Sequence, residues 1–398
     1  MNTVAPVRWP AIAALTTVSA LSQIGQFGIG FMVLPVWLAQ RGLDAPRAGL
    51  FSASQWTGML AGLLIAPWLM ERIGAKRTVS LGLAATVLAF ATMNALWWPL
   101  WLVPGLLTGL GIGLRWIANE TWLYRLVPAE SSGRVVGVHE ALIASAGVIG
   151  PALAVWCAVD GRITFAAGAA FTFAAALPLW LTASDDRPAA VKPARPARTG
   201  SAAKSASIGP MVSLGMVVVA AGGIGDGALY GLFPLFADAR GLSTTQTATL
   251  LTLFGVGGMA LQFPVGWFAD RAGLAATVIV CAALSTLAIC GFALAAPASW
   301  LAGASALLLG GMNSAYITLG MVAAACSDKA SLTRNMRLVS LTFTASSIVG
   351  PLIAGFAMKA HGSDMLLWQL AIMSGALVVY TLGLREGRRQ PDRSSSMG

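Results

Sequence analysis

Long apolar segments follow one another along most of the chain, separated by short stretches rich in charged residues, Gly and Pro. A helix rises 1.5 Å per residue, so about 20 apolar residues cross the roughly 30 Å hydrocarbon core of a bilayer. The segments do not alternate polar and apolar residues, which argues against a transmembrane β-barrel. The pattern predicts twelve membrane-spanning helices, at 10–38, 46–70, 77–97, 99–124, 135–158, 162–183, 210–237, 244–269, 274–296, 299–326, 335–358 and 364–385.

The composition supports an all-α membrane protein. Charged residues make up 10% of the 398 residues, against roughly 25% in soluble domains. Hydrophobic residues make up 57%, and there are 45 glycines. This excludes a soluble enzyme, a secreted disulfide scaffold and a disordered protein. The first segment is too long for the apolar core of a secretory signal, so we expect a retained helix.

Four cysteines lie within the predicted spans, namely Cys157, Cys281, Cys290 and Cys326. Their spacing is not that of a metal site, and we expect them to be small buried hydrophobic residues. We expect neither a metal ion nor another cofactor.

The basic residues are distributed unevenly between the loops. Of 25 lysines and arginines, 19 lie on the side of the N-terminus, 5 lie on the opposite side, and Arg115 lies within a span. The positive-inside rule therefore predicts that both termini are cytoplasmic. The net charge of +10 is explained by contact with anionic lipid, so no nucleic-acid partner is expected.

Residues 184–209 are rich in Pro, Ala, Ser and charge, which is typical of a flexible linker. The linker divides the chain into a six-helix half at 1–183 and a second six-helix half at 210–385, followed by a cytoplasmic tail at 386–398.

The two halves are related by an internal repeat. At an offset of 199 residues, Pro35 matches Pro234, the sequence Arg-Gly-Leu at 41–43 matches 240–242, and Gly58 matches Gly257. At an offset of 200, Gly-Pro at 150–151 matches 350–351. A near-constant offset over about 120 residues indicates two parallel structural repeats, a known design of transporters that hold substrate between the halves.

The loop at 266–273 reads Gly-Trp-Phe-Ala-Asp-Arg-Ala-Gly and resembles the signature of the major facilitator superfamily between helices 8 and 9. The matching loop at 67–77 departs from that pattern by Pro67 in place of Gly and by Glu71 in place of Asp, and the second loop lacks basic residues at 274–276. The resemblance covers essentially the whole chain. It implies a membrane transporter that binds a small molecule, and we expect a monomer in a bacterial inner membrane.

In this family the two loops latch the cytoplasmic side, because an acidic residue in each faces the positive N-terminus of a helix in the other half. The resemblance places Glu71 near the start of helix 11 and Asp270 near the start of helix 5. The alternative is that both acidic residues only cap helices and orient the chain. The residues assigned to the latch are Glu71, Arg72, Arg134, Asp270, Arg271, Arg334 and Arg337.

Residues 147–154 in helix 5 read Gly-Val-Ile-Gly-Pro-Ala-Leu-Ala and resemble the Gly-Pro motif of antiporters in the family. Small residues and Pro suit a moving helix interface. The segment is either an antiporter motif or a packing kink that says nothing about the direction of transport. The two explanations are equally good, since Gly-Pro recurs at 350–351. The helix-4 Arg of the family's drug antiporters is also replaced, by Gly105.

Helices 1, 4, 7 and 10 line the central cavity in this family, and all four carry polar or aromatic residues at helical spacing. Such faces build an apolar-walled pocket with a few directing groups. Each residue alone could instead make a structural hydrogen bond between helices. The residues assigned to substrate are Gln23, Gln26, Arg115, Asn119, Trp122, Tyr230, Phe233, Asn313 and Tyr316.

Charged residues inside spans are costly and are therefore functional candidates. Asp226 lies well inside helix 7 with no base nearby in sequence, which favours its neutral form and makes it the first candidate for proton coupling. Glu120 and Glu140 are the next candidates. They lie at one depth with Arg115 and His139, where a structural Arg115–Glu140 pair is the alternative.

The sequence therefore predicts a secondary transporter driven by protons, with export of an amphiphilic organic compound as the first choice. Uptake of a small metabolite is the second choice, in which Arg115 suits a carboxylate or phosphate. A non-transporting receptor or assembly factor is a remote alternative. An enzyme is not expected, because the chain lacks a nucleotide-binding motif and a nucleophile–His–acid set.

Overall fold

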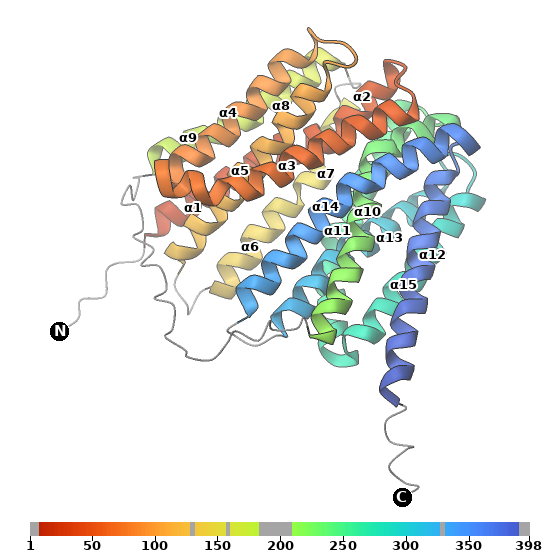
Figure 1. The fold of residues 1–398 in the computed structure, drawn as a ribbon. Coiled ribbons are helices and arrows are strands. Elements are labelled where there is room, and N and C mark those ends of the chain that lie inside the picture. The colour runs from red at the N-terminus through yellow and green to blue at the C-terminus, as the bar shows by residue number, and fades with distance from the viewer. Residues whose placement is uncertain (1–7, 128–131, 157–159, 183–208, 327–330, 390–398) are drawn as a thin grey trace, which may run out of the picture. The chain divides into compact units, whose positions relative to one another are not determined.

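The computed structural model describes residues 8–127, 132–156, 160–182, 209–326 and 331–389, all of whose regular structure is helical (Figure 1). The helices are α1 (Trp9–Gln23), the π-helix η1 (Ile24–Val33), α2 (Leu34–Gln40), α3 (Ala45–Ile73), α4 (Ala75–Met93), α5 (Leu102–Leu126), α6 (Ser132–Ala144), α7 (Ala146–Trp156), α8 (Gly161–Ala174), α9 (Ala176–Leu181), α10 (Pro210–Ala239), α11 (Thr244–Ala272), α12 (Leu274–Leu294), α13 (Trp300–Ala325), α14 (Leu332–His361) and α15 (Met365–Arg389).

Ten stretches within the described residues are long and apolar enough to cross a membrane, and they coincide with ten of the twelve predicted spans. The other two spans also form single helices, α4 and α5. Charged and polar residues lower the mean hydropathy of these two, notably Lys76 and Arg77 in α4, and Arg115 and Asn119 in α5. α5, which contains Arg115, Asn119 and Glu120, corresponds to a span that we predict to line the cavity.

The first span changes its helical form in the middle. α1 continues as η1 for ten residues and then as α2, whose second residue is Pro35. π-helical segments are rare and often occur at functional sites. Gln26, one of the predicted substrate residues, lies in η1.

The chain forms two compact units. Unit 1 contains the described residues of 1–30, 54–146 and 160–208, whereas unit 2 contains those of 31–53, 147–159 and 209–398. Within unit 2, segment 31–53 packs on the C-terminal helices: Ser52 Oγ donates to the Gly227 carbonyl at 3.2 Å, and Gln40 Nε2 donates to Thr244 Oγ1 at 2.9 Å. The compact units therefore do not follow the boundaries of the sequence repeat.

The internal repeat extends to the backbone of the turns. Gly42 and Gly241 have φ of 75° and 74°, and Gly74 and Gly273 have φ of 85° and 82°. Left-handed backbone of this kind favours glycine, since a Cβ is poorly accommodated there. The turns therefore require two of the glycine pairs that match at an offset of 199, Gly42 with Gly241 and Gly74 with Gly273.

Cation–π contacts repeat at the same offset. Arg41 lies 4.6 Å from the centroid of Trp37, and Arg240 lies 5.2 Å from that of Phe236. In the two signature loops, Arg72 and Arg271 lie 4.5 Å and 4.0 Å from Trp68 and Trp267. Each pair is four residues apart on one helix face, so the pairs follow directly from helical periodicity.

Glycines allow the helices to approach closely at matching places in each repeat. A Cβ at Gly58 of α3 would overlap the Leu106 carbonyl of α5, and a Cβ at Gly257 of α11 would overlap the Leu307 carbonyl of α13. Small residues are the usual means of close helix packing in membranes.

The glycine-rich stretch 222–227 lets α10 approach two neighbouring helices closely, one on each of two faces. Gly222 and Gly225 lie against α13, where a Cβ would come within 2.7 Å and 2.6 Å of its side chains. Gly223 and Gly227 lie against α14, where a Cβ would overlap backbone carbonyls. α10 is thus packed tightly between α13 and α14.

The expectation for the cysteines is partly wrong. Cys281 is buried, Cys290 is exposed on α12, and Cys326 is exposed directly after the end of α13; Cys157 lies outside the described residues. A lipid-facing helix surface accepts an apolar thiol as readily as a protein interior does, so apolar character did not imply burial within the protein.

Candidate functional site

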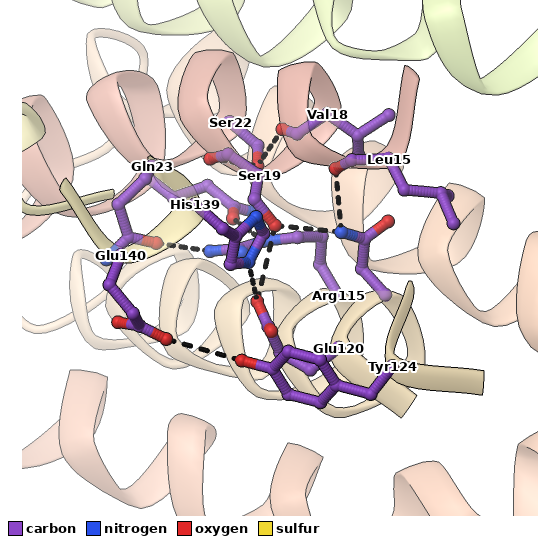
Figure 2. A network of polar contacts seen from close by, with 12 residues as sticks. Leu15, Val18, Ser19, Ser22, Gln23, Arg115, Glu120, Tyr124, His139 and Glu140 are labelled. Atoms are coloured by element: carbon purple, nitrogen blue, oxygen red, sulfur yellow. Dashed lines mark hydrogen bonds and ion pairs between the residues drawn. The ribbon is translucent and has the colours of Figure 1, made fainter. Parts of the chain in front are cut away.

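A buried polar network in unit 1 joins α1, η1, α5 and α6 (Figure 2). Arg115 and Asn119 occupy one face of α5, four residues apart, and Glu120 lies beside them. Their exposed fractions are 1%, 0% and 8%. The network therefore places three of the predicted site residues together, well removed from solvent.

Arg115 is held by two glutamines of the first span. Its Nε donates to Gln26 Oε1 at 3.0 Å, and its Nη2 donates to Gln23 Oε1. Gln26 is fixed in turn, since its Nε2 donates to Thr86 Oγ1 at 2.9 Å and Thr86 Oγ1 donates to the Gly82 carbonyl. Both partners of the guanidinium are uncharged.

Asn119 and Glu120 connect to the first span through Ser19. Asn119 Nδ2 donates to the Leu15 carbonyl at 2.9 Å and to Ser19 Oγ at 2.8 Å, and Ser19 Oγ donates to Glu120 Oε1 at 3.4 Å. His139 Nε2 lies 2.7 Å from the same Glu120 oxygen (Figure 2). Glu120 therefore contacts His139, and the Arg115–Glu140 pair considered from the sequence is replaced by other contacts.

Glu140 instead accepts a hydrogen bond from the Tyr124 hydroxyl, at 3.3 Å. The Tyr124 ring also lies edge-on to His139, with centroids 6.4 Å apart. Tyr124 and Ser19 were missed in the sequence analysis. Tyr124 lies four residues after Glu120, so helical spacing alone offered a signal for it.

Several buried atoms of the network have no hydrogen-bond partner within the described part of the chain. They are Arg115 Nη1, Asn119 Oδ1, Glu120 Oε2 and His139 Nδ1. A buried polar atom without a partner costs about 1–3 kcal/mol. Arg115 Nη1 could therefore donate one further hydrogen bond, and Glu120 Oε2 and Asn119 Oδ1 could each accept one.

Trp122 lies on the same face of α5 but belongs to an apolar cluster with Leu15, Val18, Leu83 and Leu179. It is 7% exposed. A role for Trp122 in substrate binding stays a prediction.

Unit 2 brings together Asp226 of α10 and Asn313 of α13. Asn313 Nδ2 donates to Asp226 Oδ1. Gly225 makes this approach possible, because a Cβ there would come within 2.6 Å of Asn313 Oδ1. The partner is an amide, so it leaves the charge of the carboxylate uncompensated.

The aromatic residues predicted for substrate have different surroundings. Phe233 lies in a cluster of rings, with centroid distances of 5.1 Å to Phe254 and 5.9 Å to both Phe236 and Phe292. The Tyr316 hydroxyl lies 3.0 Å from Ser285 Oγ, and Tyr230 is partly buried one turn after Asp226. Their contact with substrate stays a prediction.

The residues assigned to the latch lie at helix ends. The side chains of Glu71, Arg72, Asp270, Arg271, Arg334 and Arg337 are exposed, whereas that of Arg134 lies outside the described residues. Arg72 and Arg271 stack on Trp68 and Trp267. The latch itself stays a prediction. Among the described residues, no cluster of His, Cys, Asp and Glu could hold a metal ion.

Apolar spans, two sequence repeats and polar residues buried inside the spans define a multi-pass membrane transporter. Comparison with known proteins agrees: the sequence model of the Major Facilitator Superfamily matches residues 15–333 and 215–397. The chain belongs to this superfamily, whose fold has two six-helix pseudo-symmetric halves.

Two curated relatives are uncharacterised transporters of the same type. One, from Enterobacter sp. (strain 638), is 26% identical over 374 residues, which are 90% of this chain and 91% of the relative. The other, YcaD of Escherichia fergusonii, is 25% identical over 367 residues, which are 89% of this chain and 91% of the relative.

Solved structures of transporters share the fold at low sequence identity. The nucleoside transporter NupG (D323A mutant) superposes with a TM-score of 0.78 at 10% identity, covering 94% of this chain and 99% of NupG. A D-xylose–proton symporter has a TM-score of 0.72 at 15% identity, covering 95% of this chain and 97% of the symporter.

Proposed function

We propose that the protein is a proton-coupled secondary transporter of a bacterial inner membrane that exports an amphiphilic organic compound. It works as a monomer with both termini in the cytoplasm and catalyses no chemical reaction. The two sequence halves, 1–183 and 210–385, move around a central substrate, joined by the linker at 184–209.

The observation that carries proton coupling is the position of carboxylates inside membrane-spanning helices, where Glu120 is buried and Asp226 is partly buried. Glu120 contacts His139 at 2.7 Å in unit 1, and Asp226 contacts the uncharged Asn313 in unit 2. Buried carboxylates in spans are costly and are typical of proton relays in transporters. Asp226 is the principal coupling acid in this proposal. Glu120 and Glu140 come second, and Glu140 is the more exposed of these two.

Export is supported by the Gly-Pro segment of α7, which resembles that of antiporters. Gly147 packs against Gly255 of α11 within unit 2, since a Cβ on Gly147 would lie 3.4 Å from the Gly255 Cα. Glycine on both sides lets the backbones of the two helices approach closely, as small residues do at helix interfaces in membranes.

Uptake by proton symport is the second candidate, and a specific observation favours it. Arg115 is a buried cation with neutral partners, which suits a carboxylate or phosphate substrate. A non-transporting receptor is a third possibility that the same experiment addresses.

The test measures proton movement in proteoliposomes that contain a trapped pH-sensitive dye. Compounds from an amphiphile and organic-acid library are added outside, in the absence of an imposed gradient. Antiport moves protons outward as the compound enters, so the lumen becomes alkaline. Symport carries protons inward with the compound, so the lumen becomes acidic. Compound entry without any pH change contradicts proton coupling, and the absence of entry for the whole library favours the receptor.

A further inference from the structure

Arg115 is a buried cation that no carboxylate of the described residues neutralises at ion-pair distance. Its contacts are the side-chain oxygens of Gln23 and Gln26, which carry no charge. Glu120, the nearest acidic residue on its helix, directs Oε1 to His139 and Ser19 instead. Glu120 acts on the guanidinium through space without forming an ion pair, and its charge offsets only part of the cost of burial. Burying a charge without a direct partner is unfavourable by several kcal/mol, so an anion supplied from outside would be stabilised here.

The guanidinium is hydrogen-bonded through two of its three nitrogens. Nε is fixed by Gln26, which is 0% exposed and anchored to Thr86. Nη1 has no partner among the described residues, and Nη2 is bonded only to Gln23, which is partly exposed. An anion bound at the Nη1–Nη2 edge would accept a hydrogen bond from Nη1, which has no partner among the described residues. It would also accept one from Nη2 once the Gln23 side chain moves away.

We propose that the transported compound carries a carboxylate or phosphate monoester group that binds Nη1 and Nη2 of Arg115 and displaces Gln23. The proposal rests on the proposed transport function and names its substrate class. The planar fork of Arg matches two oxygens of such an anion, which a Lys ammonium would not. Gln26 is a positioning residue, because it orients the guanidinium without contacting the anion.

The experiment measures the thermal stability of the purified protein in neutral detergent with three pairs of probes. Benzoate, naphthalene-2-carboxylate and phenyl phosphate are the anions, and benzamide, 2-naphthamide and phenol are their uncharged counterparts. A ligand that binds the folded state raises the melting temperature, and the stabilisation grows with the logarithm of one plus the ratio of free ligand concentration to Kd. We expect at least one anion to stabilise the wild type and its uncharged counterpart to have no effect.

Variants assign that binding to Arg115. The apparent affinity for the anion should fall at least tenfold in Arg115→Gln and should not change in Arg125→Gln, which removes the same charge at an exposed position of α5. Gln23→Leu frees Nη2 and should bind the anion several-fold more tightly, which keeps the proposal testable if Arg115→Gln does not fold. Gln26→Leu should bind more weakly, and its affinity should recover in Gln26→Asn if positioning is its role.

Several results would overturn the proposal: no anion stabilising the wild type more than its uncharged counterpart, an unchanged affinity in Arg115→Gln, or weaker binding in Gln23→Leu. Phosphatidylglycerol that stabilises the wild type while all three soluble anions are inert would assign the site to lipid and overturn it too. Binding requires no gradient, so anion binding without proton-coupled transport would contradict only the proposed function. Proton-coupled transport of uncharged compounds alone would contradict only this inference.

Discussion

Asp226 lies in the middle of α10, and its described hydrogen bond comes from an amide, that of Asn313. A lysine or arginine in that place would hold the carboxylate charged throughout a transport cycle. An amide can hydrogen-bond either form of the side chain, because it donates to a carboxylate and can also accept from a carboxylic acid. The proposed proton exchange at Asp226 is therefore compatible with its contact with Asn313 of α13.

We predict that Asp226→Asn abolishes accumulation driven by a pH gradient and leaves substrate exchange without a gradient largely intact. Asn cannot bind or release the proton, but it keeps the size and hydrogen bonding of the side chain. Transport in proteoliposomes, with and without the gradient, measures both properties.

The control for this prediction is Asp238→Asn, which makes the same change at the exposed end of the same helix and should alter neither property. Unchanged gradient-driven transport in a well-folded Asp226→Asn protein would exclude Asp226 as the coupling acid. Glu120 and Glu140 would then be tested in the same way.

Among the helices, packing depends on glycines that let backbone meet backbone. Gly257 of α11 is one of these, because a Cβ there would overlap the Leu307 carbonyl of α13. Gly266, on the same helix, has open space where its Cβ would be. An alanine at Gly257 would add both steric overlap and the intrinsic effect of replacing glycine in a helix. An alanine at Gly266 would add only the intrinsic effect, so comparing the two variants isolates the cost of the overlap.

We predict that Gly257→Ala destabilises the protein by about 1–3 kcal/mol, since overpacking forces α11 and α13 apart. Gly266→Ala should be neutral or more stable by about 0.5–1 kcal/mol, because alanine loses less conformational freedom on forming a helix. Thermal unfolding in detergent gives both melting temperatures. Equal shifts in the two variants would mean that close packing at Gly257 contributes nothing.

In unit 1, hydrogen bonds from Lys76 join α4 to the end of α9, and the second sequence repeat has no lysine at the matching position. Lys76 Nζ donates to the carbonyls of Trp180 and Thr182 at 3.2 Å and 2.8 Å, where α9 ends. A cation is favourable at a helix C-terminus, where carbonyls lack partners. The corresponding residue of the second repeat is Ala275.

Lys76→Met should therefore lower stability by about 0.5–1 kcal/mol. Arg77→Met, at the exposed neighbouring position, serves as the control and should change the melting temperature little. If both variants lose stability equally, the contact with α9 is not the reason.

For the molecule as a whole, the signature loops offer the prediction of a cytoplasmic latch. In a cytoplasm-closed state, Glu71 is expected near Arg334 and Arg337 at the start of α14, and Asp270 near Arg134. Carboxylates are stabilised at helix N-termini, and the repeat relates the two contacts by symmetry.

The latch predicts that Glu71→Lys reduces transport and that adding Arg337→Glu restores much of it, because the charges attract again. Transport rates in proteoliposomes measure the effect. Lys359→Glu, at the opposite end of α14, should not restore the rate. A rescue of equal size by Lys359→Glu would reduce the effect to net charge and would contradict the latch.

The membrane-spanning helices and the turns of the internal repeat could be predicted from the sequence by itself. The spans follow from apolar length, because a bilayer leaves backbone groups no partners except those within a helix. The repeat follows from matching turns, since Gly42, Gly74, Gly241 and Gly273 all have positive φ that glycine adopts most readily. These features depend on neighbours within a few residues, and the sequence contains that information directly.

Only the tertiary structure decided the partners of the buried polar groups. Gln23 and Arg115 are 92 positions apart, and Asp226 and Asn313 are 87 apart. Helical periodicity places Arg115 and Asn119 on one face, but it does not say which helix that face meets or how each helix is rotated. The packing therefore determined that Glu120 contacts His139 while Arg115 contacts two glutamines, and that difference leaves Arg115 without an ion pair among the described residues.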